Sequence, residues 1–222
     1  MKAQDLSDAP EVGWKYSPSL TKIKYLKKYA VGADILEVGS GMGWYSKFLK
    51  ESGFSVTAVD INPLTQIEGV ELIKSDFISV DLNGRSFDTV VMFDVLEHIA
   101  DEKAALLKVK DICKRRLIMS VPNKDDAFLV KYNLTYSHFR DRTHFREYSI
   151  DQIKRVIEEN CFSAISLRLE GPVMPQVLIE FLNLKLGFLK VPLRKFITLL
   201  EKLHFLSLEN TCADIFIVAD KK

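Results

Sequence analysis

The strongest indication of the fold is the stretch Ile35-Leu36-Glu37-Val38-Gly39-Ser40-Gly41-Met42-Gly43. Its first four residues suit a buried strand, and glycines at every second position then break the apolar run. Residues 44–52 follow directly and favour a helix. Glycine lets the backbone turn sharply and lets a ligand lie against bare main chain, toward which the free N–H groups of a helix start point. The stretch therefore predicts a strand–loop–helix unit that binds a nucleotide-like cofactor.

The glycine spacing indicates which kind of cofactor this is. A dinucleotide fingerprint has the pattern G-x-G-x-x-G, and its third glycine allows close packing of the helix on the strand. Here the pattern is G-x-G-x-G, and Trp44 stands where that third glycine belongs. Because a tryptophan cannot replace this glycine, NAD is disfavoured. The Gly-Lys-Ser/Thr ending of a phosphate-binding P-loop is also absent from this stretch.

Two further strand ends carry acids. Residues 55–60 favour a strand that ends in Asp60, with Ile61 after it, and an acid at this position can accept hydrogen bonds from both ribose hydroxyls. Residues 70–77 favour a strand that ends in Asp76-Phe77. A side-chain acceptor beside an aromatic ring suits the exocyclic amine and the flat face of adenine.

The next two motifs complete a series. Residues 87–99 predict a strand through Phe93, followed by Val95-Leu96-Glu97-His98, and residues 116–123 predict a fifth strand with its exit loop. Five motifs in this order over residues 33–123 resemble the class I S-adenosylmethionine-dependent methyltransferases. The resemblance implies S-adenosyl-L-methionine as cofactor. The residues expected to bind it are Glu37, Gly39, Ser40, Gly41, Gly43, Asp60, Ile61, Asp76, Phe77 and Phe93.

The alternation of elements predicts an α/β fold with a doubly wound sheet and helices on both faces. Helices are expected at about 17–29, with Ser17 as N-cap, and at 44–52, 99–113 and 150–160. The last two strands are expected at 164–169 and 213–219. The resemblance implies a Rossmann-like, seven-stranded sheet of order 3-2-1-4-5-7-6 with the seventh strand antiparallel. We expect residues 1–222 to form a single methyltransferase domain.

Composition indicates which partners, cysteine chemistry and cellular compartment to expect. The formal net charge of +1 shows no basic excess, so we expect no nucleic-acid partner. The three cysteines are widely spaced and odd in number, which predicts buried thiols rather than a disulfide framework or a metal cluster. The first residues lack the apolar core of a signal peptide. These features favour a cytoplasmic protein.

Three histidines, His98, His138 and His144, are candidate bases, and His98 and His144 are the preferred catalytic residues. His98 follows the fourth strand at the edge where ligands bind in such folds, and His144 lies in the polar and aromatic stretch 136–148, where the family commonly builds a substrate lid. Either could take a proton from the acceptor. A structural role at a helix end remains open for His98, and stretch 136–148 is equally compatible with a plain surface loop.

A metal site is a further alternative. Residues Asp94, Glu97 and His98 share one face if their turn is helical, and His144 would complete a set able to hold a divalent ion. Some quinone-precursor and RNA 2′-O-methyltransferases use a similar arrangement. The shorter Asp in the first position and the presence of a Glu-His pair in relatives without metal favour no metal here.

A long hydrophobic insertion is expected at about 172–208, between the sixth and seventh strands. It is dense in Leu and Phe, and Gly187 and Pro192 predict two helices with a break between them. Interior charges exclude a membrane-spanning helix. The apolar surface of residues 176–206 is expected to pack on the protein's own core, on a second subunit in a homodimer, or on lipid or a lipophilic substrate as a peripheral membrane contact.

Three function classes follow. The preferred one is methyl transfer by in-line displacement to a small-molecule acceptor, with O-methylation favoured and a lipophilic substrate considered. The loop after Phe93 lacks the Asn/Asp-Pro-Pro-aromatic motif of nucleic-acid amino-methyltransferases. The alternatives are a non-catalytic cofactor-binding or interaction protein that uses the insertion and, with less support, an NAD-dependent oxidoreductase.

Overall fold

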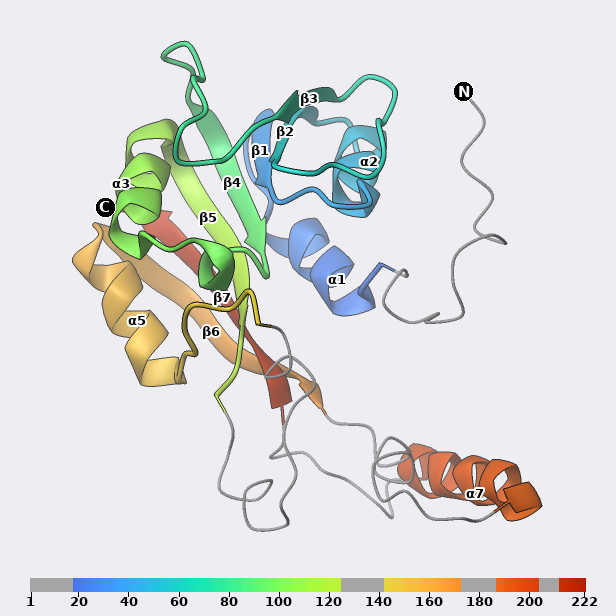
Figure 1. Ribbon diagram of the computed structural model, residues 1–222. Coiled ribbons are helices and arrows are strands. Elements are labelled where there is room, and N and C mark those ends of the chain that lie inside the picture. Colours follow the sequence, from blue (N-terminus) through green and yellow to red (C-terminus); the bar gives the residue numbers. More distant parts are fainter. Residues whose placement is uncertain (1–17, 125–141, 173–186, 204–211) are drawn as a thin grey trace.

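The computed structural model describes residues 18–124, 142–172, 187–203 and 212–222, and Figure 1 shows how their elements are arranged. The strands are β1 (Asp34–Val38), β2 (Ser55–Asp60), β3 (Glu71–Lys74), β4 (Phe87–Phe93), β5 (Cys113–Pro122), β6 (Phe162–Pro172) and β7 (Cys212–Lys221). The helices are α1 (Leu20–Tyr29), α2 (Trp44–Glu51), α3 (Glu102–Ile112), α5 (Ile150–Glu159) and α7 (Lys190–Lys202), with 3-10 turns η3 (Leu96–His98) and η5 (Gly187–Leu189).

One seven-stranded sheet organises the molecule. Its order is β3-β2-β1-β4-β5-β7-β6, and the first five strands of the chain pair in parallel. Strand β7 is antiparallel to both of its neighbours, β5 and β6. The predicted fold class and strand order are therefore confirmed. The carboxyl ends of β1, β2, β4 and β5 meet at one edge of the sheet, called the carboxyl edge below.

The sheet carries a hydrophobic core on each face because its central strands are buried on both sides. Alternate residues of β4 show this: Val90 and Met92 belong to one core, and Val91 and Phe93 to the other. Helices α3 and α5 cover the first face, and α1 and α2 cover the second (Figure 1). This double burial explains why the strand sequences are continuous apolar runs.

Helix α1 starts later than the sequence predicted. It begins at Leu20, and the Ser19 Oγ accepts a hydrogen bond from the Lys22 N–H at 3.4 Å, as an N-cap does. The prediction of Ser17 as N-cap is wrong, because two serines flank Pro18 and the second one closes the helix.

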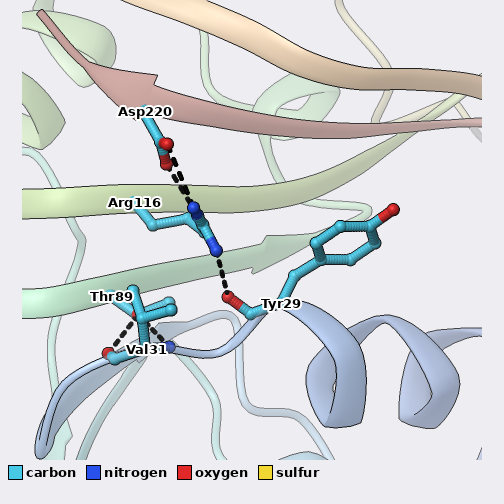
Figure 2. Close-up of polar contacts among 5 residues, drawn as sticks. All are labelled: Tyr29, Val31, Thr89, Arg116 and Asp220. Carbon is cyan, nitrogen blue, oxygen red and sulfur yellow. Dashed lines mark hydrogen bonds and ion pairs between the residues drawn. The ribbon is translucent and has the colours of Figure 1, made fainter.

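A polar network fixes the other end of α1 to the amino-terminal edge of the sheet (Figure 2). The Arg116 guanidinium pairs with both Asp220 carboxylate oxygens, at 2.6 and 3.0 Å, and donates to the Tyr29 carbonyl at 3.1 Å. The Thr89 hydroxyl donates to the Val31 carbonyl at 2.7 Å and accepts from the Val31 N–H at 3.1 Å. These contacts join the exit of α1 to β4, β5 and β7 and so hold the helix against the sheet.

The insertion between β6 and β7 differs from its prediction where it is described. Helix α7 begins at Lys190 and continues through Pro192, so the predicted break at Gly187–Pro192 is wrong at its proline end. Proline is tolerated there because the N–H groups of a first helical turn have no partner within the helix. The helix expected before Gly187 lies outside the described residues. Among the described helices none has both the length and the apolar character needed to cross a membrane.

Candidate active site at the carboxyl edge

The glycine loop between β1 and α2 adopts a backbone that favours glycine. Gly39, Gly41 and Gly43 all have positive φ angles, at 75°, 48° and 73°. A Cβ atom on Gly39 would lie 2.4 Å from the Val95 side chain, so this loop touches the loop after β4. A Cβ on Gly41 would meet no atom within 4 Å. The space beside Gly41 is therefore open, as a cofactor lying on the main chain requires.

Asp60 at the end of β2 fixes this loop. Its carboxylate accepts from the Gly41 N–H and the Asn62 N–H, both at 2.7 Å. Each carboxylate oxygen has a second lone pair, so the group retains acceptor capacity for ribose hydroxyls. The neighbouring Ile61 side chain is 61% exposed and offers an apolar surface at the same edge.

Two buried polar atoms of the loop and the first turn of α2 have no hydrogen-bond partner among the described residues: the Ser40 hydroxyl and the Trp44 indole N–H. Buried polar groups are nearly always paired, so an unpaired set points to a missing ligand or water. Both atoms lie in the strand–loop–helix unit that was predicted to hold the cofactor. The loop thus combines open space at Gly41 with unused polar groups, and it fits a cofactor with hydrogen-bonding groups.

Glu37 lies beneath the loop and is almost fully buried. The Ser46 hydroxyl of α2 donates a hydrogen bond to its carboxylate. Burial raises the pKa of Glu37 to about 8, although the bond from Ser46 opposes this shift. At neutral pH the group is therefore mostly protonated, and it can both donate and accept hydrogen bonds at the base of the loop.

The remaining residues predicted to bind the cofactor are Asp76, Phe77 and Phe93, and the structure gives the contacts of each. Asp76 accepts from the Ile78 and Ser79 N–H groups at 2.8 and 3.1 Å and thereby orders the turn after β3. Phe77 is packed in the core with residues of α3, and its contact with the adenine stays a prediction. Phe93 is buried on the other face, with its ring 5.3 Å from the ring of Tyr45.

An ion pair that the motifs did not reveal closes the site from the side of α1. The Lys22 ammonium lies 2.5 Å from one Asp94 oxygen, and the Ser120 hydroxyl donates to the other at 2.5 Å. Burial favours neutral Asp94, but the nearby Lys22 charge outweighs it and lowers the pKa of this carboxyl. Asp94 also has a positive φ of 55°, a conformation uncommon for a residue other than glycine and typical of functional loops.

A second acid approaches Asp94 from β7. Burial, together with the charge of Asp94, raises the pKa of Asp214 to about 7. The register places Asp214 opposite Pro122, at the end of β5. Sequence reasoning had no signal for Lys22 or Asp214, since their contacts join segments far apart in the chain.

Both candidate catalytic histidines are brought together next to Glu97. The rings of His98 and His144 are 4.5 Å apart and nearly perpendicular. The Thr143 hydroxyl contacts Nδ1 of His98 at 2.8 Å, and the Phe145 N–H donates to the Glu97 carbonyl at 2.9 Å. We call Glu97, His98 and His144 the Glu–His cluster.

Arg146 holds the cluster in shape. Its guanidinium donates to the carbonyls of Leu96, Ile99 and Ala100, at distances of 2.5 to 3.2 Å. These bonds tie the segment that carries His144 to turn η3, which carries His98. His138, the other histidine of stretch 136–148, lies outside the described residues.

The Glu–His cluster has the composition of a metal site. Its three residues each offer one ligand atom, and these atoms all lie within 4.8 Å of one another. Glu97 is fully buried, yet within the described part of the chain neither of its carboxylate oxygens has a hydrogen-bond partner. Burial, followed by the charge of Asp94, raises the pKa of Glu97 to about 8. The alternative metal set considered from the sequence differs from this cluster in one respect: Asp94 pairs with Lys22 and Ser120 and is not part of the cluster.

Comparison with known proteins shows to which family this architecture belongs. A family model described as a methyltransferase domain matches residues 17–167. The chain belongs to this methyltransferase family. The expected enzyme class and cofactor, an S-adenosylmethionine-dependent methyltransferase of class I, are thereby confirmed, and the NAD alternative is set aside.

Solved structures of methyltransferases share the fold. An S-adenosylmethionine-dependent methyltransferase from Archaeoglobus fulgidus superposes with a TM-score of 0.63 at 20% identity, covering 90% of this chain and 92% of its own. Magnesium protoporphyrin IX methyltransferase from Synechocystis PCC 6803, with bound S-adenosylhomocysteine, gives a TM-score of 0.57 at 16% identity and coverages of 91% and 81%. At these identities the likeness establishes the fold.

Two curated relatives match shorter parts. A ubiquinone biosynthesis O-methyltransferase from Xanthomonas euvesicatoria is 30% identical over 110 residues, which are 43% of this chain and 46% of that protein. A ribosomal RNA large subunit methyltransferase E from Wolbachia pipientis is 36% identical over 53 residues, covering 24% of this chain and 28% of that protein. The matches thus span less than half the length of either relative. One relative acts on a small molecule and the other on RNA, so the expected absence of a nucleic-acid partner stays a prediction.

Proposed function

We propose that this methyltransferase transfers the methyl group of S-adenosylmethionine to a hydroxyl group of a small, lipophilic acceptor at the Glu–His cluster. The observation that carries the proposal is the pairing of His98 and His144 beside the buried Glu97. The cluster lies next to the glycine loop, because Val95 touches Gly39 two residues before Glu97. The curated quinone-pathway O-methyltransferase supports an O-linked acceptor.

In this proposal the glycine loop and Asp60 hold the cofactor. The cofactor would lie against the open backbone at Gly41 and form hydrogen bonds with the unpaired groups of Ser40 and Trp44. The Ile61 side chain would pack on its adenine base. The bound cofactor supplies an already activated methyl group. The protein must then align the acceptor oxygen behind that group and exclude water, which is a positioning task.

We assign His144 as the base that takes the proton of the acceptor hydroxyl. His98 is oriented by Thr143, and Arg146 holds the two histidines next to each other. When His144 takes the proton, a positive charge forms near Glu97. That charge lowers the pKa of Glu97, and Glu97 that has released its own proton to solvent stabilises the protonated base.

A divalent cation in the Glu–His cluster is a second candidate for activating the hydroxyl. It is favoured by the two unpartnered oxygens of Glu97, a buried group for which a cation would supply the missing partner. Two imidazoles and one carboxylate suit zinc or iron better than magnesium. Added metal that raises the turnover of the chelated enzyme would favour this role, and activity unchanged by chelator would favour the plain base.

The experiment compares His144→Asn with the wild type, using a catechol and a long-chain phenol as acceptors. We expect the rate of methyl transfer to fall about 10²–10⁴-fold, the usual contribution of a general base. Binding of S-adenosylmethionine should stay unchanged, because His144 lies outside the glycine loop. Transfer to neither acceptor, together with labelling of RNA, would overturn the small-molecule assignment. Binding without turnover on any acceptor would instead identify a non-catalytic cofactor-binding protein.

A further inference from the structure

The segment from η5 to α7 exposes an unusual amount of apolar surface. Six large hydrophobic side chains between residues 188 and 203 are at least half exposed, more than in any other described part of the chain. They are Phe188 at 88%, Leu189 at 51%, Val191 at 53%, Phe196 at 56%, Leu199 at 50% and Leu203 at 53%. In Figure 1 helix α7 lies beyond the ends of β6 and β7, apart from the sheet.

Three of these side chains form a stripe along α7. Phe196, Leu199 and Leu203 follow one another at steps of three and four residues, which places them on one side of the helix. Leu193, Ile197 and Leu200 lie on the adjoining side and are half-buried. The protein therefore covers only part of the apolar face of α7 and leaves the rest in contact with water.

The charge of the same segment selects the partner. Residues 187–203 contain four basic residues and one acidic residue, a net charge of +3, whereas the whole chain carries +1. An isologous dimer through α7 would bring two such surfaces together, and like charges repel. An anionic lipid surface instead attracts basic residues while it takes up the apolar stripe.

The topology connects this segment to the active site. Strand β6 ends at Pro172 and β7 begins at Cys212, so the insertion leaves and re-enters the sheet at the carboxyl edge. Asn123, which follows β5, donates its side-chain amide to the Cys212 carbonyl at 2.9 Å and its backbone N–H to the Ala213 carbonyl at 2.8 Å. The base of the insertion is therefore bonded to the same edge that carries Asp94 and Ser120.

We propose that the η5–α7 surface docks on an anionic lipid bilayer and that the enzyme takes an amphiphilic acceptor from that bilayer. An amphipathic helix with apolar and basic faces lies in the interface plane and binds through buried apolar area and attraction to anionic lipids. Docking brings the carboxyl edge of the sheet to the lipid surface. The evidence for docking comes from the η5–α7 segment alone. The inference that the acceptor comes from the bilayer depends on the proposed function.

The test uses the full chain in flotation with lipid vesicles. Vesicles of phosphatidylcholine are compared with vesicles containing about 30% phosphatidylglycerol, a fraction that gives a negative surface potential. We expect binding to be about tenfold or more tighter on the anionic vesicles, and to weaken as salt screens the charges. The triple variant Phe196→Ser/Leu199→Ser/Leu203→Ser should lose this binding, because it removes the exposed stripe.

Matched controls come from α3 on the sheet. Leu107→Ser removes an apolar side chain that is 43% exposed, and Lys103→Glu reverses an exposed charge. Both should bind vesicles as the wild type does, whereas Lys195→Glu on α7 should weaken binding. The triple variant should keep wild-type affinity for S-adenosylmethionine in the absence of vesicles.

Three results would overturn the docking proposal. One is equal or absent binding to the two vesicle types, and another is loss of binding in the α3 controls. The third is a homodimer in sedimentation that the triple variant dissociates, which would show that a second copy covers the stripe. Vesicle binding by a protein without affinity for S-adenosylmethionine would leave the docking intact and refute the proposed function separately.

Discussion

Gly41 shows how a single residue makes room for the cofactor. Its φ of 48° lies in the left-handed region, and no atom would contact an added Cβ. Gly39 differs, because a Cβ there would clash with Val95 at 2.4 Å. A substitution at Gly39 would therefore disturb the protein itself, whereas one at Gly41 reports on the space beside the loop.

We expect Gly41→Ala to abolish measurable binding of S-adenosylmethionine, because the new methyl group enters the space reserved for the ligand. The left-handed backbone should also cost about 1–2 kcal/mol of stability. Calorimetric titration and urea unfolding measure the two effects. Gly84→Ala is the control: its φ is 70° and its Cβ would also meet open space, so it should cost similar stability and leave binding intact. Equal binding by both variants would remove Gly41 from the site.

Glu37 predicts a pH dependence of stability. Its ordinary pKa is 4.5, and burial raises it to about 8 in the folded protein. The folded state thus holds a proton that the unfolded state has lost, so this contribution is fully present below pH 4.5 and is lost as pH rises toward 8. Relative to Glu37→Gln, the wild type should lose up to about 1.4 kcal/mol of unfolding free energy per pH unit in this window. Parallel pH profiles for the two proteins in urea unfolding would contradict the raised pKa.

At the scale of elements, α1 borders the site and is anchored at both of its ends. Its exit is bonded to the amino-terminal edge of the sheet by Arg116, and its start is bonded to the Tyr45 hydroxyl of α2 by the Ser19 N–H at 3.0 Å. Between these anchors Lys22 reaches Asp94. The helix therefore connects the glycine-loop side of the sheet to the loop after β4.

Lys22→Met should destabilise the protein by roughly 1–3 kcal/mol, because it leaves Asp94 without its cation. The Lys22 side chain is 12% exposed and that of Asp94 is 40% exposed, so solvent screening keeps the loss below that of a fully buried pair. Adding Asp94→Asn should recover part of the stability. Urea unfolding of the four proteins of this cycle measures the coupling, and strictly additive losses would show that the pair contributes nothing.

The sequence predicted the elements well because their signals are local. Buried strands such as 55–60 and 87–93 are mainly apolar runs with an acid at the last position (Asp60) or directly after it (Asp94), and the glycine loop has a recognisable spacing. The observed boundaries differ from the predicted ones where two local signals compete. The start of α1 is an example, because Ser17 and Ser19 flank Pro18 and either could have been the N-cap. The continuation of α7 through Pro192 was missed because a proline in a first turn has the same sequence appearance as one that breaks a helix.

The candidate site was less predictable, since its decisive contacts are long-range. His98 and His144 could be named, but only the folded chain shows that they meet, through bonds from Phe145 and Arg146 to turn η3. The Lys22–Asp94 pair joins residues 72 positions apart. No local pattern marks such a contact, so the sequence could not show that Asp94 pairs with Lys22.

At the scale of the whole molecule, the parts of the site come together at one edge of the sheet. The glycine loop, Asp60, Asp94, the Glu–His cluster and the base of the insertion all lie at the carboxyl edge, while the Arg116 network closes the opposite edge. The open α/β fold places ligands at this edge because the strand ends diverge there. That residues 1–222 act as a single domain stays a prediction.

Ligand binding should therefore stabilise the molecule as a whole. At a concentration about 100 times the dissociation constant, S-adenosylmethionine should add about 2.7 kcal/mol to the unfolding free energy. Differential scanning fluorimetry would show this as a rise in melting temperature, and the rise should be absent in Gly41→Ala. NAD at the same concentration should have no effect. A rise with NAD alone would contradict the assigned cofactor.

The most direct test of the central claim is calorimetric titration of the wild-type protein with S-adenosylmethionine. We expect saturable one-to-one binding that the Gly41→Ala variant lacks and that NAD cannot reproduce. A folded wild-type protein that releases no binding heat, or a Gly41→Ala variant that binds as the wild type does, would contradict the assignment of the carboxyl edge as a methyltransferase site.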